Sequence, residues 1–167
     1  MPAFAPRRKI IAAVCALVAL GGAWAGGCWW SQRNVLPGML PVQIAEGPIE
    51  FLARLDTGAT VSSINAEHIE VIGGEGRPTR RDIGRKIRFE LVNHRGQRAP
   101  LEAEIAEIHG IRSADCREIR YHVYLTVAFR GRMQRVLMNL NDRGATDEKL
   151  LLGRNWLDQG YGVAPGG

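Results

Sequence analysis

Asp56 is the residue of this 167-residue chain whose surroundings best suit chemistry. It follows the largely apolar run FLARL and opens a Thr-Gly-Ala turn. A carboxylate at the end of a buried strand is costly to desolvate unless hydrogen-bond donors surround it. The backbone amides after Asp56 can donate to it, Gly58 lets the main chain approach closely, and the Thr57 hydroxyl can bond a neighbouring element. We therefore expect Thr57, Gly58 and Ala59 to hold Asp56 rigid and facing a cavity.

One acid held in this way can bind a ligand, whereas two facing acids can share a proton. One acid then serves as the base toward a water, and the other, protonated, polarises a carbonyl. Two like charges a few ångströms apart cannot both ionise. This chemistry hydrolyses peptides without a metal or a covalent intermediate. The Asp-Thr-Gly triplet occurs once in the chain, so the second acid would come from a second copy across a two-fold axis.

Short strand-like runs surround this turn, and several alternate apolar with polar residues: 40–45, 49–55, 86–92, 101–108, 117–129 and 133–140. The residues between them predict a tight turn at 46–48 and hairpins that turn at 93–96 and 130–132. A short helical patch is expected from Asn65, ending at Gly73-Gly74. The fold class is therefore mostly β, as one domain with a small closed sheet and one or two short helices.

A second motif, Leu151-Leu152-Gly153-Arg154-Asn155, ends the domain. Together with the Asp-Thr-Gly-Ala turn, it resembles the retropepsins, the single-domain aspartic proteases of the pepsin superfamily. Among these proteases, the chain resembles a bacterial retropepsin-like family once labelled "ATP-dependent zinc proteases". This resemblance covers roughly residues 40–157. The matching segments are Arg112-Ser113, Arg117 to Arg120, Asp142-Arg143 and Leu151 to Arg154.

This resemblance implies a retropepsin-like closed β-barrel that acts as an aspartic endopeptidase in a homodimer, with Asp56 as the catalytic acid. It also implies that Gly153-Arg154-Asn155 opens a short helix below the catalytic loop. Many relatives have an acid four residues after the catalytic one, where this chain has Thr60. Arg154 therefore needs another partner, for which Asp142 is the candidate.

The arginines of the matching segments have two interpretations. Arg112, Asp142, Arg143 and Arg154 are expected to form an ion-pair network that fixes the site. An arginine cluster near the cleft would also favour acidic peptide substrates. For the flap over the cleft, we choose the hairpin that turns at 93–96, and the segment 109–117 is the rival.

The sequence predicts no cofactor, metal or nucleic-acid partner. The histidines at 68, 94, 109 and 122 lack metal-binding spacing, and no phosphate-binding Gly-rich loop is present. Cys116 is the single cysteine beyond residue 30, which excludes an internal disulfide or a cysteine metal cluster there. Of the formal charge of +5, three units belong to Arg7-Arg8-Lys9, so the domain carries no concentrated basic stripe.

The stretch from Ile10 to Trp30 holds 21 residues without a charge, and about 20 suffice to cross a bilayer as a helix. Trp29-Trp30 at its end suit the aromatic belt of a membrane interface. Arg7-Arg8-Lys9 before it, with few basic residues directly after it, favour a cytoplasmic N-terminus. We therefore expect a single-pass inner-membrane anchor with a periplasmic or extracellular domain. A cleaved signal peptide, with Ala23-Trp24-Ala25 as the cleavage site, and a lipidated Cys28 are the alternatives.

The expected organisation is a cytoplasmic basic segment (1–9), a transmembrane signal-anchor (10–30), a linker (31–38), the protease domain (39–160) and a flexible tail (161–167). Two functions fit it. The first is a membrane-anchored aspartic endopeptidase acting on peptides or proteins. The second is a catalytically inactive retropepsin-like module that binds a peptide or a partner at the membrane. The sequence does not separate them, because both keep the Asp56 loop.

Overall fold

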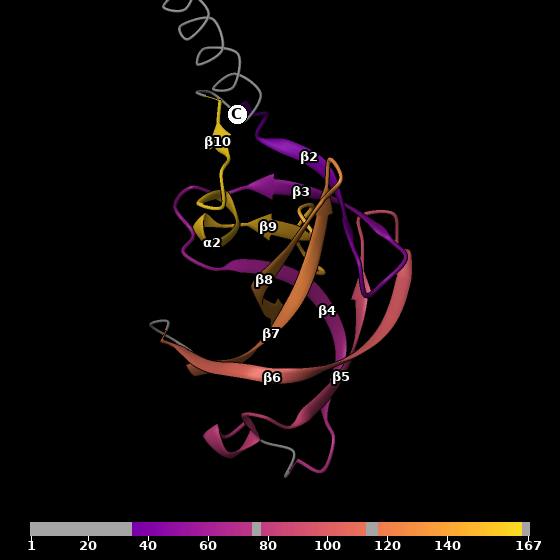
Figure 1. Ribbon diagram of the computed structural model, residues 1–167. Coiled ribbons are helices and arrows are strands. Elements are labelled where there is room, and N and C mark those ends of the chain that lie inside the picture. The colour runs from indigo at the N-terminus through magenta and orange to yellow at the C-terminus, as the bar shows by residue number, and fades with distance from the viewer. Residues whose placement is uncertain (1–34, 75–77, 113–116, 165–167) are drawn as a thin grey trace, which may run out of the picture. The chain divides into compact units, whose positions relative to one another are not determined.

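The structure, a computed structural model, describes residues 35–74, 78–112 and 117–164, without the side chains of 111–118. The compact domain spans Leu36–Gly167 (Figure 1). The expected membrane segment and Cys116 lie outside the described residues. Among the residues described, no helix has the length and apolar character to cross a bilayer.

The described residues form a mostly-β domain with one short α-helix, as the sequence predicts. The helices are η1 (Arg80–Asp82, a 3-10 helix) and α2 (Arg154–Leu157). The strands are β1 (Val35–Leu36), β2 (Met39–Ile44), β3 (Glu50–Leu55), β4 (Ser62–Val71), β5 (Lys86–Val92), β6 (Arg98–Arg112), β7 (Arg117–Phe129), β8 (Arg132–Asn141), β9 (Leu150–Leu152) and β10 (Gly162–Val163). Within the described part, β1 and β10 pair with each other, although both lie outside the expected limits 39–160.

The main sheet has the strand order β2-β3-β9-β4-β5-β6-β7-β8, with additional pairings β2–β7 and β4–β8 that fold it back on itself. The short strand β9 lies between β3 and β4, parallel to β3 and antiparallel to β4. The loop that carries Asp56 joins β3 to β4. Both strands that flank this loop are therefore hydrogen-bonded to the segment that leads into α2.

The helical patch expected from Asn65 is wrong, because that segment belongs to β4. Its first half pairs with β8, from Ser62 opposite Met138 onward, and its second half pairs with β5. A register irregularity separates Glu67 from Glu70, and His68 between them adopts φ +51°. A bulge interrupts the two-residue alternation of a strand, and the sequence then resembles a helical spacing. Pairing with distant strands outweighs that local pattern.

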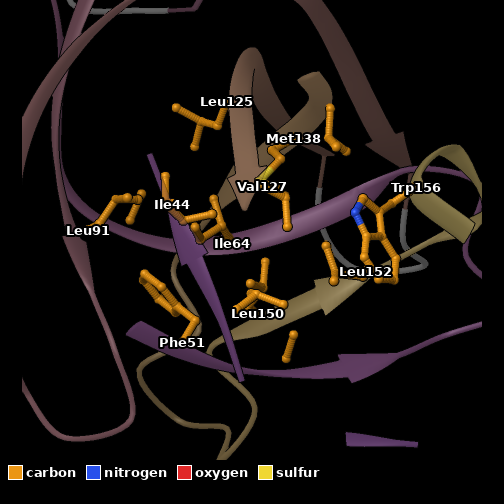
Figure 2. Close-up of a cluster of buried hydrophobic side chains, with 14 of the residues drawn as sticks. Ile44, Phe51, Ile64, Leu91, Leu125, Val127, Met138, Leu150, Leu152 and Trp156 are labelled. Atoms are coloured by element: carbon orange, nitrogen blue, oxygen red, sulfur yellow. The ribbon is translucent and has the colours of Figure 1, made fainter. Parts of the chain in front are cut away.

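The core lies between the strands and α2, and alternate residues of each strand supply it (Figure 2). In β3, for example, Phe51, Ala53 and Leu55 are buried. Trp156 of α2 is fully buried and stacks on Tyr161, with ring centroids 4.4 Å apart. Phe129 at the end of β7 contacts both rings edge-on, at 5.9 Å each. This aromatic cluster fixes α2 against the sheet.

The substitution Trp156→Ala tests the role of this cluster in stability. It removes the largest fully buried side chain of the described residues and leaves a cavity, so we expect it to lower the free energy of unfolding by about 3–5 kcal/mol. Urea denaturation followed by circular dichroism measures the change. Met133→Ala, at a side chain that is 68% exposed, is the matched control and should stay within about 0.5 kcal/mol of the wild type. Equal effects of the two changes would contradict this account of the core.

Candidate active site

The loop after β3 holds Asp56 by backbone hydrogen bonds. The Asp56 amide donates to the carbonyl of Leu152 in β9 at 3.0 Å. Its Oδ1 accepts from the amides of Gly58, at 2.9 Å, and Ala59, at 3.1 Å. A Cβ at position 58 would lie 3.2 Å from the same oxygen, so glycine gives the loop room to close around the acid. The expected donors to Asp56 are thus present, and one carboxylate oxygen is fixed in place.

An open depression of about 600 Å³ adjoins this acid. The residues that line it come from the start of the domain, from β3 and its loop, and from the segment before β9: Gly38, Met39, Arg54, Leu55, Asp56, Thr57 and Glu148. Arg54 and Glu148 form an ion pair across it, at 2.9 Å. Sequence reasoning missed this pair, because its members are 94 positions apart and neither belongs to a motif.

Gly153 packs directly against the Asp56 loop. A Cβ at this position would lie 2.8 Å from the carbonyl oxygen of Ala59 and 3.0 Å from the backbone of Val61. The amide of Arg154 donates to the same Ala59 carbonyl at 2.9 Å. Only glycine therefore allows the start of α2 to lie this close to the loop.

Side chains complete the connection between α2 and the loop. The Ser62 hydroxyl donates to Oδ1 of Asn155 at 2.8 Å and accepts from the Gly153 amide at 3.0 Å. Asn155 Nδ2 donates to the carbonyl of Leu137 in β8 at 2.8 Å. The helix expected below the loop is present, and its first residues join β4, β8 and the loop into one hydrogen-bonded unit.

The expected pairing of Arg154 with Asp142 is wrong. Arg154 Nη2 donates to the Thr60 hydroxyl at 2.8 Å, and Nη1 lies 3.5 Å from the Thr57 carbonyl. Thr60 thus takes the place of the acid found four residues after the catalytic one in many relatives. Asp142 instead accepts from the amide of Gly144 at 2.8 Å, which caps its own turn. The arginine still braces the loop, but through neutral oxygens.

The arginine of the Asp142-Arg143 pair is held beside the site without an ion pair. Arg143 donates from its amide to Asn65 Oδ1 and from Nε to the Glu148 carbonyl, each at 2.7 Å. Within the described residues, no carboxylate lies at salt-bridge distance from its guanidinium. Burial places the pKa of Arg143 below its usual value. The negative charges of Glu148 and Asp56 act in the opposite direction but only partly offset this effect. The expected ion-pair network therefore does not form here, and the side chain of Arg112 lies outside the described part.

The turn at 93–96 does not cover the Asp56 loop, so the first choice for the flap is wrong. Asn93 Nδ2 donates to the carbonyl of Glu50 at 2.8 Å, and His94 Nδ1 accepts from the amide of Leu52 at 3.4 Å. The turn therefore docks on the start of β3, whereas Asp56 follows its end. Figure 1 shows the end of β6 and the start of β7 on the same side of the domain as α2 and the β3–β4 loop.

A group with metal-ligand chemistry, missed in the sequence, lies in the β4 irregularity: Glu67, His68 and Glu90. Arg98 donates to both carboxylates. This cation already offsets one of the two negative charges, and the His68 side chain is 77% exposed. Within the described residues, no hydrogen bond or ion pair joins this group to the Asp56 loop.

A mostly-β domain with one short helix beneath an Asp-Thr-Gly loop defines the retropepsin-like class of aspartic endopeptidases. The family model for the retropepsin-like aspartic endopeptidase RimB matches residues 39–166. The chain therefore belongs to the RimB-like family. That description does not include the "ATP-dependent zinc protease" label.

A solved structure supports the fold. The crystal structure of Lpg0085, a protein of unknown function from Legionella pneumophila subsp. pneumophila, superposes with a TM-score of 0.59. The two share 22% sequence identity, over 79% of this chain and 93% of the other. At this identity the likeness concerns the fold alone. Among curated proteins, none matches the sequence significantly.

The substitution Gly153→Ala tests the contact between α2 and the Asp56 loop. Its Cβ would overlap the Ala59 carbonyl, so we expect it to lower the free energy of unfolding by about 1–3 kcal/mol. Gly162→Ala is the matched control, because a Cβ there meets nothing within 4 Å, and it should change stability by no more than about 0.5 kcal/mol. Denaturant unfolding of both variants measures this. A fully tolerated Gly153→Ala would show that the loop can move away from α2.

Proposed function

We propose that this protein is a membrane-anchored aspartic endopeptidase that hydrolyses peptide bonds with a water activated by an Asp56 dyad across a homodimer. The observation that carries the proposal is the Asp56 loop: one carboxylate, oriented by two amides and braced by α2, beside an open depression. Membership of the RimB-like family agrees with it.

The second acid of the dyad has no candidate within the described part of one copy. Glu148 is the other acid that lines the depression, and its carboxylate is bound to Arg54. A second copy related by a two-fold axis would supply an Asp56 with the same orientation. The two carboxylates would then share one proton, so that one activates the water and the other polarises the scissile carbonyl.

Arg143 supports a preference for acidic peptides. Its guanidinium is half-buried, lies near enough to Asp56 for their charges to interact, and has no ion pair within the described residues. A substrate carboxylate would supply the missing negative charge through charge-assisted hydrogen bonds. Arg54, which lines the depression, is already paired with Glu148 there and so adds no uncompensated positive charge.

The uncharged stretch from Ile10 to Trp30 supports anchoring in the inner membrane, with a cytoplasmic N-terminus and a periplasmic or extracellular domain. Cleavage or lipidation of this segment remains the alternative route of export. A membrane anchor would also concentrate the subunits in two dimensions and so promote the homodimer.

The substitution Asp56→Asn tests catalysis directly. We expect kcat/KM on a peptide library to fall by at least about 1,000-fold, because the dyad loses the group that shares its proton. Asp142→Asn is the matched control: its Oδ1 also accepts a hydrogen bond from an amide two residues on, and its activity should be unchanged. Full peptidase activity of Asp56→Asn would overturn the assignment. If the wild type cleaves no peptide and Asp56→Asn lowers stability or partner binding, the protein is the inactive binding module.

Mixed dimers test whether the dyad forms across two copies. With a fourfold excess of Asp56→Asn subunits, random pairing leaves about one fifth of the wild-type subunits in wild-type dimers. Peptidase activity per wild-type subunit should therefore fall about fivefold after the subunits exchange. A fourfold excess of an inert protein is the control. Unchanged activity would show that one copy carries the complete catalytic site.

A further inference from the structure

The first residues of the domain and the turn between β7 and β8 meet at one end of the molecule. The carbonyl of buried Leu36, in β1, accepts from the amide of Ala164 at 2.9 Å. Tyr161, which leads into β10, contacts Phe129 at the end of β7, with ring centroids 5.9 Å apart. Figure 1 shows β10 and the β7–β8 turn at the same end. The chain therefore enters the domain near this turn.

The turn and its flanks, Phe129–Met133, form an exposed basic hairpin. Arg130 and Gly131 have φ values of 47° and 74°, as in a tight two-residue hairpin turn. Arg130 and Arg132 are exposed. Met133 is 68% exposed, more than any other large hydrophobic residue described.

The two strands of the basic hairpin carry charge of one sign near the turn. The sequence from Ile119 to Asn141 contains four arginines and no acid. Two acids from the preceding β2–β3 hairpin lie beside them, and both have partners: Glu50, which lines the same depression as the basic hairpin, pairs with Arg95 at 3.5 Å, and Glu46 accepts from the amide of Thr126. Arg135 lies over the ring of Tyr124, at 4.3 Å from its centroid, and that ring is itself exposed. Arginines that flank an exposed apolar side chain and an aromatic ring suit the interface of an anionic membrane.

Chain length limits how far this end of the domain can lie from a bilayer. Six residues lead from Trp30, the last of the uncharged stretch, to Leu36. Fully extended, they span about 20 Å. If residues 10–30 cross the membrane, as the proposed function holds, the basic hairpin lies close to the lipid headgroups.

We propose that the basic hairpin docks on the anionic surface of the bilayer in which the chain is anchored. Arg130 and Arg132 contact lipid phosphates, and Met133 enters the headgroup region. This inference rests on the membrane anchor of the proposed function but not on the Asp56 dyad. A two-fold axis normal to the bilayer would allow both hairpins of a dimer to dock at once.

Vesicle binding of residues 31–167, which contain the compact domain and its core, tests the docking surface. We expect sedimentation with vesicles of phosphatidylcholine and about one third phosphatidylglycerol, and much less with phosphatidylcholine alone. The double variant Arg130→Gln, Arg132→Gln should lower the partition coefficient by about 25-fold, since each arginine near the surface contributes about fivefold.

The matched control is Arg80→Gln, Arg81→Gln, which removes two exposed arginines from η1. Figure 1 shows the segment before β5, where η1 lies, at the end of the domain away from β10. This control should bind vesicles like the wild type. An equal loss in both double variants would overturn the proposal, because the binding would then follow net charge alone. A hairpin variant that keeps full binding, or one that loses self-association instead, would also overturn it.

The full chain in the same vesicles separates this inference from the proposed function. Docking should slow amide hydrogen exchange at 129–134 about tenfold relative to detergent micelles, and the hairpin variant should lose this protection. If the chain stays in the vesicles but exchange is unchanged, the docking fails and the anchor stands. If the chain leaves the vesicles, anchor and docking both fail. The rate at which the hairpin variant cleaves a soluble peptide should equal that of the wild type. This activity depends on the Asp56 dyad and not on docking, so it tests the proposed function separately.

Discussion

The close approach of Gly153 to the backbone of the Asp56 loop is the constraint on which the site depends. A side chain at this position would overlap the Ala59 carbonyl, and that carbonyl accepts the first amide of α2. Because the loop is supported from below by a helix of four residues, its conformation does not rely on its own short sequence. The buried Trp156 ring holds that helix in turn. The position of one carboxylate thus follows from packing in the core.

The strand pairing extends this support to the whole sheet. β9 lies between β3 and β4, the two strands that the Asp56 loop joins, so the loop spans a gap of two strand spacings, about 10 Å. The Leu152 carbonyl of β9 also accepts the Asp56 amide. A three-residue strand therefore sets both the width of the loop and the direction of its acid. This explains why the motif near residue 56 and the motif near residue 153 occur together in the sequence.

Six of the ten described strands, β2, β3, β5, β6, β7 and β8, were predictable from alternation, and β5 and β7 begin and end where the pattern does. The errors arose where a distant partner decides the outcome. The bulge in β4 removed the alternation around His68. Arg154 donates to the Thr60 hydroxyl rather than to a carboxylate. No rule of sequence spacing predicts that an arginine will bind a hydroxyl. The Arg54–Glu148 pair joins residues that only the β3–β9 pairing brings together. The Asp56 motif itself was predictable from the sequence, because the residues that follow Asp56 in the chain also donate its hydrogen bonds.

The same geometry bears on the proposed dimer. Within the described residues, Oδ1 of Asp56 has two amide donors, and Oδ2 accepts no hydrogen bond. In a single copy, water can solvate this oxygen at the open depression, so leaving it without a protein donor costs little free energy. When two copies meet, the two carboxylates lose water and repel each other unless they share a proton. Formation of the dyad would then take up about one proton per dimer, so association would weaken as the pH rises. Dimerisation and the protonation state needed for catalysis would therefore be a single linked equilibrium.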